Sequence, residues 1–290
     1  MGVLLDRLVG EPPAPVHPVV LFGRAMGATE GKIYRDQRLA GAIHAATGAV
    51  LGASAGALVR STTVATVMAV GGRALRQAAL EVHTALNVGN EGRARELLPA
   101  LVGRDPSGLD AAEIARAAVE SVAENTVDAV VAPALWAALA GAPGALGYRA
   151  VNTMDAMVGH RSARYFNYGW ASARLDDLAN WVPARCTATL VALVRPGSAK
   201  DVWRAVSSQA PAHPSPNAGV AEAAFAAALG IRLGGTNQYG ERTEVRPQLG
   251  WGRGARPDDI IQAVRLSRDV GTALAAVLGT GGAAKWLKGR

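Results

Sequence analysis

The sequence predicts an all-α fold: a polytopic helical membrane protein with polar helical and loop segments and a short strand and turn region near residues 230–254. Three observations lead to this fold class. Half of the 290 residues are hydrophobic, and only 18% are charged, whereas charged residues make up about 25% of a typical soluble domain. Several uncharged runs are long enough to cross a bilayer. We expect a single helical membrane domain over residues 1–290.

The longest uncharged run covers residues 39–59. As a helix it would span roughly 30 Å, which is enough for the hydrocarbon core of a bilayer. The remaining predicted apolar segments lie near 61–80, 129–148 and 178–194, with a weaker one near 270–284. The polar regions between them cover 81–127 and 195–265.

Gly48, Gly52 and Gly56 are four residues apart and form one smooth face of the first segment. Such spacing lets a second helix approach closely in lipid. We expect the following run, residues 61–72, to be that partner. The alternative is a buried Ala/Gly helical hairpin in a soluble bundle.

The segment 129–148 contains Pro133, Gly141 and Gly144, which would kink or break a helix. If this segment crossed the membrane once, the polar clusters on its two sides, at Glu120 and at Asp155, would face opposite compartments. A broken or re-entrant pair of half-helices lining a cavity avoids that conflict.

The net charge of +7 and the pI near 10.1 are compatible with nucleic acid, anionic lipid or an anionic substrate. No Lys/Arg-rich run interleaved with aromatic residues occurs, so we expect no nucleic-acid partner. Basic residues flanking apolar runs fit membrane proteins. The single cysteine, Cys186, excludes an intrachain disulfide and makes a structural zinc site improbable.

Glu120, Glu124 and Asp128 lie within an arc of roughly 80° on one helical face. Three carboxylates on one face repel one another. They need a compensating cation, either Mg²⁺ with oxygen ligands or an arginine cluster. The alternative is a solvated acidic face.

Two further clusters carry polar groups suited to binding. Asn152 and Asp155 share a helical face, and Arg161 follows with a guanidinium suited to phosphate or carboxylate. Asp176 and Asp177 precede the fourth apolar run, where acidic residues also serve as helix caps. No P-loop or dinucleotide-binding glycine motif is present.

The segment 210–217 contains three prolines and should form a rigid, extended loop that fixes His213 and Asn217. An Ala-rich helix is expected from about Val220. We expect substitution of His213 or Asn217 to lower activity more than stability.

Several ordered motifs together resemble the CobD/CbiB family, the adenosylcobinamide-phosphate synthases of cobalamin biosynthesis, over nearly the whole chain. The motifs are Asp6-Arg-Leu-Val-Gly10-Glu11-Pro12-Pro13 with His17-Pro18-Val19, Gly103-Arg104-Asp105, Glu120-Ser-Val-Ala-Glu124-Asn125, Tyr148-Arg149-Ala-Val-Asn152-Thr153-Met-Asp155, Arg174-Leu-Asp176-Asp177, His213-Pro-Ser-Pro-Asn217-Ala-Gly219 and Gly230-Ile-Arg232-Leu-Gly234-Gly235. Two departures are a short segment before Asp6 and His160 in place of an aromatic residue.

The resemblance implies ATP-dependent amide formation between a propionate carboxyl of adenosylcobyric acid and aminopropanol phosphate. It implies ATP and Mg²⁺ as cofactors, a multi-pass position in the cell membrane, a cytoplasmic active site, and other cobalamin-assembly enzymes as partners. The acids expected to act in catalysis are Glu120, Glu124, Asp128 and Asp155, and the first three are expected to bind the metal. The residues expected to bind substrate are Asp6, His17, Arg104, Asn125, Asn152, Arg161, Asp176, Asp177, His213 and Asn217.

Two other functions fit acids and broken helices in apolar segments. A membrane transporter also uses such features at its substrate site. A non-catalytic scaffold that gathers corrinoid enzymes is the second alternative. Formation of the amide product by the purified protein would exclude both.

Overall fold

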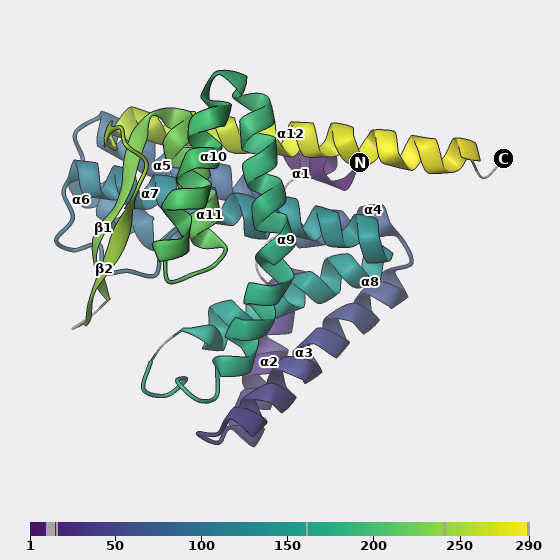
Figure 1. The fold of residues 1–290 in the computed structure, drawn as a ribbon. Coiled ribbons are helices and arrows are strands. Elements are labelled where there is room, and N and C mark those ends of the chain that lie inside the picture. The colour runs from purple at the N-terminus through teal and green to yellow at the C-terminus, as the bar shows by residue number, and fades with distance from the viewer. Residues whose placement is uncertain (10–14, 16, 161, 240–241, 289–290) are drawn as a thin grey trace. The chain divides into compact units, whose positions relative to one another are not determined.

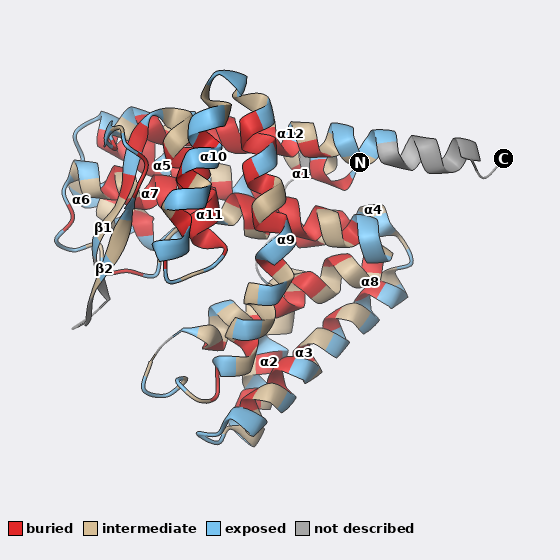
Figure 2. Ribbon diagram, in the orientation of Figure 1, coloured by how far each residue is buried: buried red, intermediate tan, exposed pale blue. Residues whose placement is uncertain are grey.

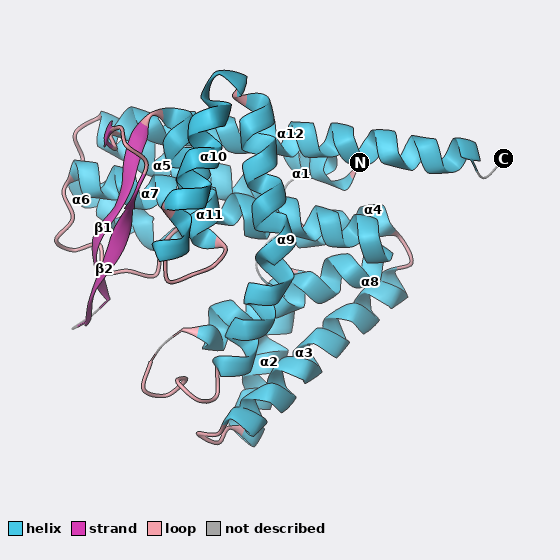
Figure 3. Ribbon diagram, in the orientation of Figure 1, coloured by secondary structure: helices cyan, strands magenta, loops and turns pink. Residues whose placement is uncertain are grey.

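The computed structural model describes residues 1–9, 15, 17–160, 162–239 and 242–288. The described chain is mostly helical and contains a three-stranded sheet (Figure 3). The helix-rich fold is therefore confirmed, as is the location of the strands between residues 231 and 254. Residues 10–13 of the opening motif lie outside the described residues.

The chain divides into two compact units, and each unit is built from two separate stretches of sequence. Unit 1 comprises Met1–Gly71 and Asp128–Pro183, and unit 2 comprises Gly72–Val127 and Ala184–Arg290. The expectation of a single domain over residues 1–290 stays a prediction.

Unit 1 is helical, and at its centre α3 (Arg38–Val59) packs against α8 (Ala132–Met154) (Figure 1). Its helices are α1 (Gly2–Val9), α2 (Pro18–Ile33), α3 (Arg38–Val59), α4 (Thr62–Ala69), α8 (Ala132–Met154) and the first part of α9 (Trp170–Val194). π-helical turns at Val127–Val131 and Asp155–Gly159 flank α8.

The glycine face of α3 packs against α8. A Cβ atom added at Gly52 would clash with Ala150 and with the Leu146 carbonyl oxygen, and one at Gly56 would clash with the backbone at Ala142. The groove predicted from the glycine spacing is therefore real. The predicted partner is wrong, because α8 fills the groove and residues 61–72 do not.

The predicted apolar segment 61–80 is not one helix. α4 ends at Ala69, and α5 (Gly72–Asn87) begins after a break at Val70–Gly71. α4 has 8 residues, which give a length of only about 12 Å. Segment 61–80 is therefore too short and too divided to cross a bilayer.

α8 is kinked, as its prolines and glycines predict. Ala140 (φ −128°, ψ 16°) and Gly141 (φ 65°, ψ −150°) leave the helical region. The positive φ at Gly141 is accessible because glycine lacks a Cβ atom. The kink divides the apolar stretch into two shorter helical pieces, while the re-entrant arrangement stays a prediction.

Two helices among the described residues are long and apolar enough to cross a membrane, judged by length and composition alone. They are Arg38–Val59 and the helical stretch Ala111–Gly159. The predicted segments near 178–194 and 270–284 are also helical, within α9 and α12 (Pro257–Lys288). The larger number of membrane segments stays a prediction.

Unit 2 packs helices around α7 (Ala111–Thr126) and α11 (Ala218–Leu229), whose residues are mostly buried (Figure 2). α7 begins with the capping box predicted from Asp110 and Glu113, because each of the two side chains accepts a hydrogen bond from the other residue's backbone N–H. The other helices of the unit are α5, α6 (Glu91–Leu97), α10 (Ala199–Ser208), α12 and the end of α9.

The sheet of unit 2 has the strand order β2-β1-β3. β1 (Ile231–Tyr239) pairs antiparallel with β2 (Arg242–Leu249) and parallel with β3 (Arg253–Gly254). The register between β1 and β2 shifts between Leu233 and Gly235, next to Pro247, which has no N–H to donate. This irregularity places Gly234 at the edge of the candidate site.

The loop before α11 differs in part from the predicted extended form. Residues Ala210–Ala212 form a 3₁₀ turn, and His213 returns to extended backbone (φ −74°, ψ 141°). The Ser215 hydroxyl then accepts hydrogen bonds from the backbone N–H groups of Asn217 and Ala218. Ser215 therefore caps α11, which starts at Ala218 rather than near Val220.

The close approach of α3 and α8 yields a stability prediction. Gly52→Ala should lower the free energy of unfolding by about 1–3 kcal/mol, because the added methyl group has no space against α8. The matched control is Gly31→Ala on α2, where an added Cβ meets nothing within 4 Å. The control should gain about 0.5–1 kcal/mol from its better helix propensity. Thermal unfolding of both variants in detergent measures the difference, and equal melting temperatures would contradict the packing.

Candidate functional site

Glu120 on α7 is a buried carboxylate that joins three parts of unit 2. Its Oε2 atom accepts a hydrogen bond from Arg104 at 3.0 Å, and its Oε1 atom accepts one from Arg116 at 3.3 Å. Oε1 also accepts the backbone N–H of Gly234 on β1 at 2.9 Å. The side chain is 7% exposed, so these donors replace water around the charge.

The charge of Glu120 is compensated by arginine. The sequence leaves two possibilities for the acidic face, Mg²⁺ or an arginine cluster, and at Glu120 the structure has the cluster. Arg116 is one helical turn before Glu120, and it also donates to the carbonyl oxygens of Gly234 and Thr236 at 2.9 and 3.0 Å. Two guanidinium groups therefore share the Glu120 carboxylate.

Gly234 needs to be glycine at this position. Its φ of 84° lies in the left-handed region, and a Cβ atom there would clash with the Pro247 carbonyl oxygen. The resulting backbone orientation directs its N–H toward Glu120 and its carbonyl oxygen toward Arg116. The Gly234-Gly235 pair of the sequence pattern therefore serves the acid–arginine cluster.

Glu222 on α11 is a second buried acid, which was not among the residues predicted from the sequence. The residue is fully buried, and neither of its carboxylate oxygens has a hydrogen-bond partner among the described residues. Its nearest charged groups are Arg246 Nη1 at 3.7 Å and His213 Nε2 at 3.8 Å. Burial raises the pKa of the Glu222 carboxyl group well above its usual range, and the charges of Glu120 and Glu124 raise it further.

His213 and Asn217 are positioned by the proline-rich loop, as predicted. Nδ1 of His213 lies 3.1 Å from both the backbone nitrogen and the carbonyl oxygen of Ser215. Its other ring nitrogen faces Glu222. Asn217 accepts a hydrogen bond from Arg185 at 3.0 Å. Burial lowers the pKa of His213 below its ordinary value of 6.5.

Glu124 and Asn125 occupy the next turn of α7. Glu124 is exposed at the surface, while the protein atoms around its carboxyl group desolvate it and raise its pKa above the usual value. Asn125 donates its amide to the carbonyl oxygen of Ser121 at 3.0 Å and to the Ser121 hydroxyl at 3.2 Å. Glu124 is therefore the acid of the α7 face that is accessible to a ligand.

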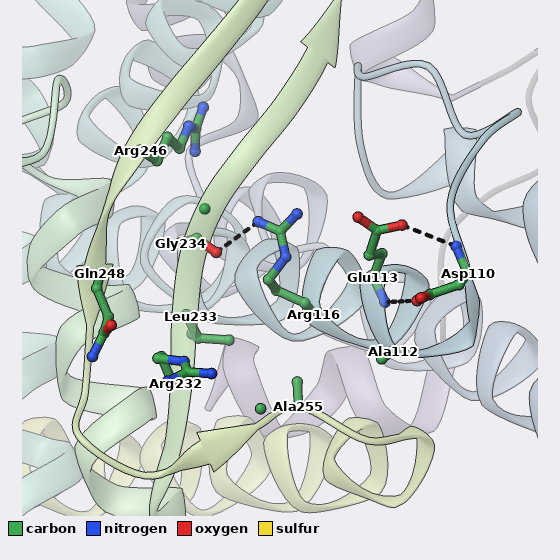
Figure 4. Close-up of a pocket in the computed structure, with 12 residues that line it drawn as sticks. Asp110, Ala112, Glu113, Arg116, Arg232, Leu233, Gly234, Arg246, Gln248 and Ala255 are labelled. Atoms are coloured by element: carbon green, nitrogen blue, oxygen red, sulfur yellow. Dashed lines mark hydrogen bonds between the residues drawn. The ribbon is translucent and has the colours of Figure 1, made fainter.

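A pocket of about 340 Å³ opens beside this cluster, between the start of α7 and the sheet. Arg116, Arg232 and Arg246 line one part of it, and the capping-box residues Asp110 and Glu113 line the other (Figure 4). Arg116 and Arg246 also contact the buried acids Glu120 and Glu222. The buried cluster and the pocket are thus physically connected.

Unit 1 holds a separate polar network around Asn152. Its amide donates to Asp128 at 3.2 Å and to Asp176 at 3.3 Å. Asn180 donates to the other oxygen of Asp176 at 3.0 Å and accepts the Tyr148 hydroxyl at 2.8 Å. α8 and α9 therefore bring together the predicted residues Asp128, Asn152 and Asp176.

The remaining predicted residues of unit 1 lie in other settings. Asp155 starts the π-turn Asp155–Gly159, and a side chain at Gly159 would collide with its carboxylate. Asp177 lies 3.6 Å from Arg174, and Asp6 is buried on α1. His17 caps α2 by accepting the backbone N–H of Val19. Arg161 lies outside the described residues.

The three acids predicted to share one Mg²⁺ are distributed over both units. Glu120 and Glu124 belong to unit 2, and Asp128 belongs to unit 1 and lies within the π-turn Val127–Val131. Both oxygens of Glu120 already accept hydrogen bonds, so Glu120 fits an arginine-neutralised acid better than a magnesium ligand. Among the described residues, no group of three or more His, Cys, Asp or Glu side chains is arranged to hold a metal ion. The shared magnesium site stays a prediction.

Glu222, Arg116 and Arg246 belong to the cluster but were not predicted. The sequence around the first two contains a pattern that indicates their roles. Glu222 is the only charged residue in the otherwise apolar helix Ala218–Leu229, which indicates a functional or paired acid. Arg116 precedes Glu120 by four residues, the spacing of a helical ion pair. Arg246 left no signal, because its proximity to Glu222 depends on the pairing of β2 with β1.

The sequence matches the family described as "CobD/Cbib protein" over residues 1–267. A protein of Mycobacterium tuberculosis named "Cobalamin biosynthesis protein CobD" is 49% identical over 96% of this chain and 93% of its own length. Proteins with the same name from Chromobacterium violaceum and Geobacter metallireducens are 44% and 43% identical, over 92% and 86% of this chain and 90% and 84% of their own lengths. No solved structure matches the chain.

The raised pKa of Glu222 predicts a specific pH dependence of stability. The folded protein retains the Glu222 proton to higher pH than the unfolded chain, whose pKa is near 4.5. The contribution of Glu222 to the free energy of unfolding is therefore fully present below pH 4.5. It is lost as the pH rises toward the raised pKa of the folded state. Glu222→Gln should remove this loss and make the protein more stable than wild type above that range.

Chemical denaturation across a pH series measures the effect. His213 contributes the opposite slope, because its pKa is lowered below 6.5, so the informative quantity is the difference between wild type and Glu222→Gln at each pH. Glu96→Gln is the control, since Glu96 is exposed and forms a surface ion pair with Arg93 on α6. A pH-independent difference between wild type and Glu222→Gln would show that Glu222 titrates normally.

Proposed function

Because the chain belongs to the CobD/CbiB family, we propose that it is a cobalamin-biosynthesis enzyme that joins a propionate carboxyl of adenosylcobyric acid to aminopropanol phosphate in an ATP-dependent reaction. Its relatives carry the name of that pathway. The product is an amide, adenosylcobinamide phosphate. The enzyme is then a carbon–nitrogen ligase.

The observation that carries this proposal is the acid–arginine cluster of unit 2 beside an open pocket. A carboxylate is a poor acyl donor until its oxygen is converted into a leaving group, and ATP performs that conversion by phosphorylation. The phosphorylated carboxyl and the phosphate groups of the other substrates are anions, which fixed guanidinium groups stabilise. Arg104 and Arg116 are held in place by Glu120, so they need no reorganisation during the reaction.

We assign Glu124 as the proton acceptor for the attacking amine. An ammonium group cannot attack a carbonyl carbon until it loses a proton, and a nearby carboxylate accepts that proton. Glu120 is occupied by three hydrogen-bond donors, and Glu222 is fully buried. Glu124 is the exposed acid on the same helix. In this proposal Mg²⁺ accompanies the phosphates of ATP, which are its usual ligands in such reactions.

We also propose that the enzyme is a multi-pass protein of the cell membrane with its ATP-using site on the cytoplasmic side. α3 buries its small residues and exposes large apolar ones: Val50 is 64% exposed and Leu58 is 81% exposed, whereas Gly48, Gly52 and Gly56 are buried. A helix of a soluble protein shows the reverse pattern. Lipid tails are the partner that favours an apolar outer face with a small-residue inner face. Other cobalamin-assembly enzymes would then be neighbours at that membrane.

The reaction is tested with purified protein, adenosylcobyric acid, ATP and aminopropanol phosphate. Wild type should form the amide, and Glu124→Gln should lower kcat by about 10²- to 10⁴-fold, the usual value for a general base. Glu96→Gln, an exposed acid on α6, should keep full activity. No amide from wild type would refute the proposed reaction, and full activity of Glu124→Gln would refute the assigned base. Partial recovery at raised Mg²⁺ would instead make Glu124 a metal ligand.

Membrane insertion is tested by fractionation. Because α3 exposes apolar side chains along its outer face, the protein should stay in membranes washed with alkaline carbonate, as an inserted protein does. A peripheral protein held by its positive charge would be released by the same wash or by high salt. Recovery of a monodisperse protein without detergent would contradict the membrane assignment.

A further inference from the structure

The pocket beside the cluster has positive charge at one end and negative charge at the other. Figure 4 shows Arg116, Arg232 and Arg246 near Gly234, while Asp110 and Glu113 lie across the pocket at the start of α7. All five residues belong to unit 2. The pocket therefore offers three guanidinium groups to one ligand group without relying on the other unit.

Two of the three arginines are fixed before any ligand arrives. Arg116 is held by the carbonyl oxygens of Gly234 and Thr236 and by Glu120. Arg246 donates to Glu244 at 3.2 Å and lies 3.7 Å from Glu222. Arg232 is exposed on β1 and lines the same pocket. Guanidinium groups held in this way bind oxyanions with little loss of side-chain entropy.

The charge of this end suits a phosphate monoester. Arg116, Arg232 and Arg246 line this end of the pocket, whereas the two carboxylates that line the pocket, Asp110 and Glu113, lie at the other end. A phosphate monoester carries about −1.5 to −2 charges at neutral pH and three acceptor oxygens. A triphosphate is longer and more negative, and in this pocket it would extend toward Asp110 and Glu113. Repulsion by these two carboxylates favours the monoester.

We propose that the pocket binds the phosphate group of a small phosphate monoester through Arg116, Arg232 and Arg246. If the proposed function is correct, the ligand is the phosphorylated aminoalcohol rather than ATP. This identification rests on the proposed function, whereas the binding of a monoester phosphate does not. The pocket is then the place where the enzyme distinguishes a phosphorylated aminoalcohol from a free one.

Calorimetric titration of the full chain in detergent micelles tests the proposal without turnover. The ligands are aminopropanol phosphate, aminopropanol, inorganic phosphate and ATP. Arg232→Gln should weaken binding of aminopropanol phosphate at least about tenfold, because one charge-assisted contact is lost. Arg93→Gln on α6, an exposed arginine away from the pocket, should bind like wild type. Aminopropanol should show no binding, and ATP binding should be the same in both variants.

Unchanged affinity of Arg232→Gln for aminopropanol phosphate and for inorganic phosphate would overturn the proposal. A loss confined to ATP would also overturn it, because the pocket would then hold a nucleotide. The two proposals fail separately. Normal phosphate binding without amide product would refute the reaction and leave the phosphate site standing, whereas amide formation with unaltered binding in Arg232→Gln would refute only the site.

Discussion

The buried carboxylate of Glu120 is the interaction on which unit 2 depends. It accepts hydrogen bonds from Arg104 before α7, from Arg116 on α7 and from the Gly234 backbone on β1. A charge removed from water at this depth is tolerated only when such donors surround it. Once they do, the helix, the preceding loop and the sheet are held in one arrangement. The pocket next to the cluster takes its shape and its charge from that arrangement.

The same constraint explains the chemistry that the cluster can support. Two of the three arginines that line the pocket also contact a carboxylate behind it, Glu120 for Arg116 and Glu222 for Arg246. The carboxylates orient the guanidinium groups, and the groups keep enough positive charge to bind an anion. In unit 1 an amide takes the place of the arginines, because Asn152 donates hydrogen bonds to both Asp128 and Asp176. Acid pairs in the two units are thus stabilised by arginine in one and by amide in the other.

Local patterns in the sequence predicted the elements that depend on local contacts. The capping box at Asp110, the glycine face of α3, the kink near Gly141 and the strands after residue 230 all follow from spacing and residue type. The partner of α3 could not be found in this way, because α8 lies far along the chain and contacts α3 only in the folded unit. The single face predicted for Glu120, Glu124 and Asp128 assumed an unbroken α-helix, and the π-turn at Val127–Val131 changes that geometry. Glu222 and Arg246 join the site only through tertiary packing of α11 and β2.

The discontinuity of both units has a consequence for synthesis of the chain. The last residue of unit 1 to be synthesised is Pro183. The first stretch of unit 2 is synthesised between the two stretches of unit 1, and its second stretch follows Pro183. The glycine face of α3 therefore leaves the ribosome long before α8 exists to cover it. In the meantime a nascent chain has to shield that face by other means, such as lipid or a chaperone. No contiguous fragment contains either unit alone, so dissecting this protein requires a circularly permuted gene or co-expressed pieces rather than a simple truncation.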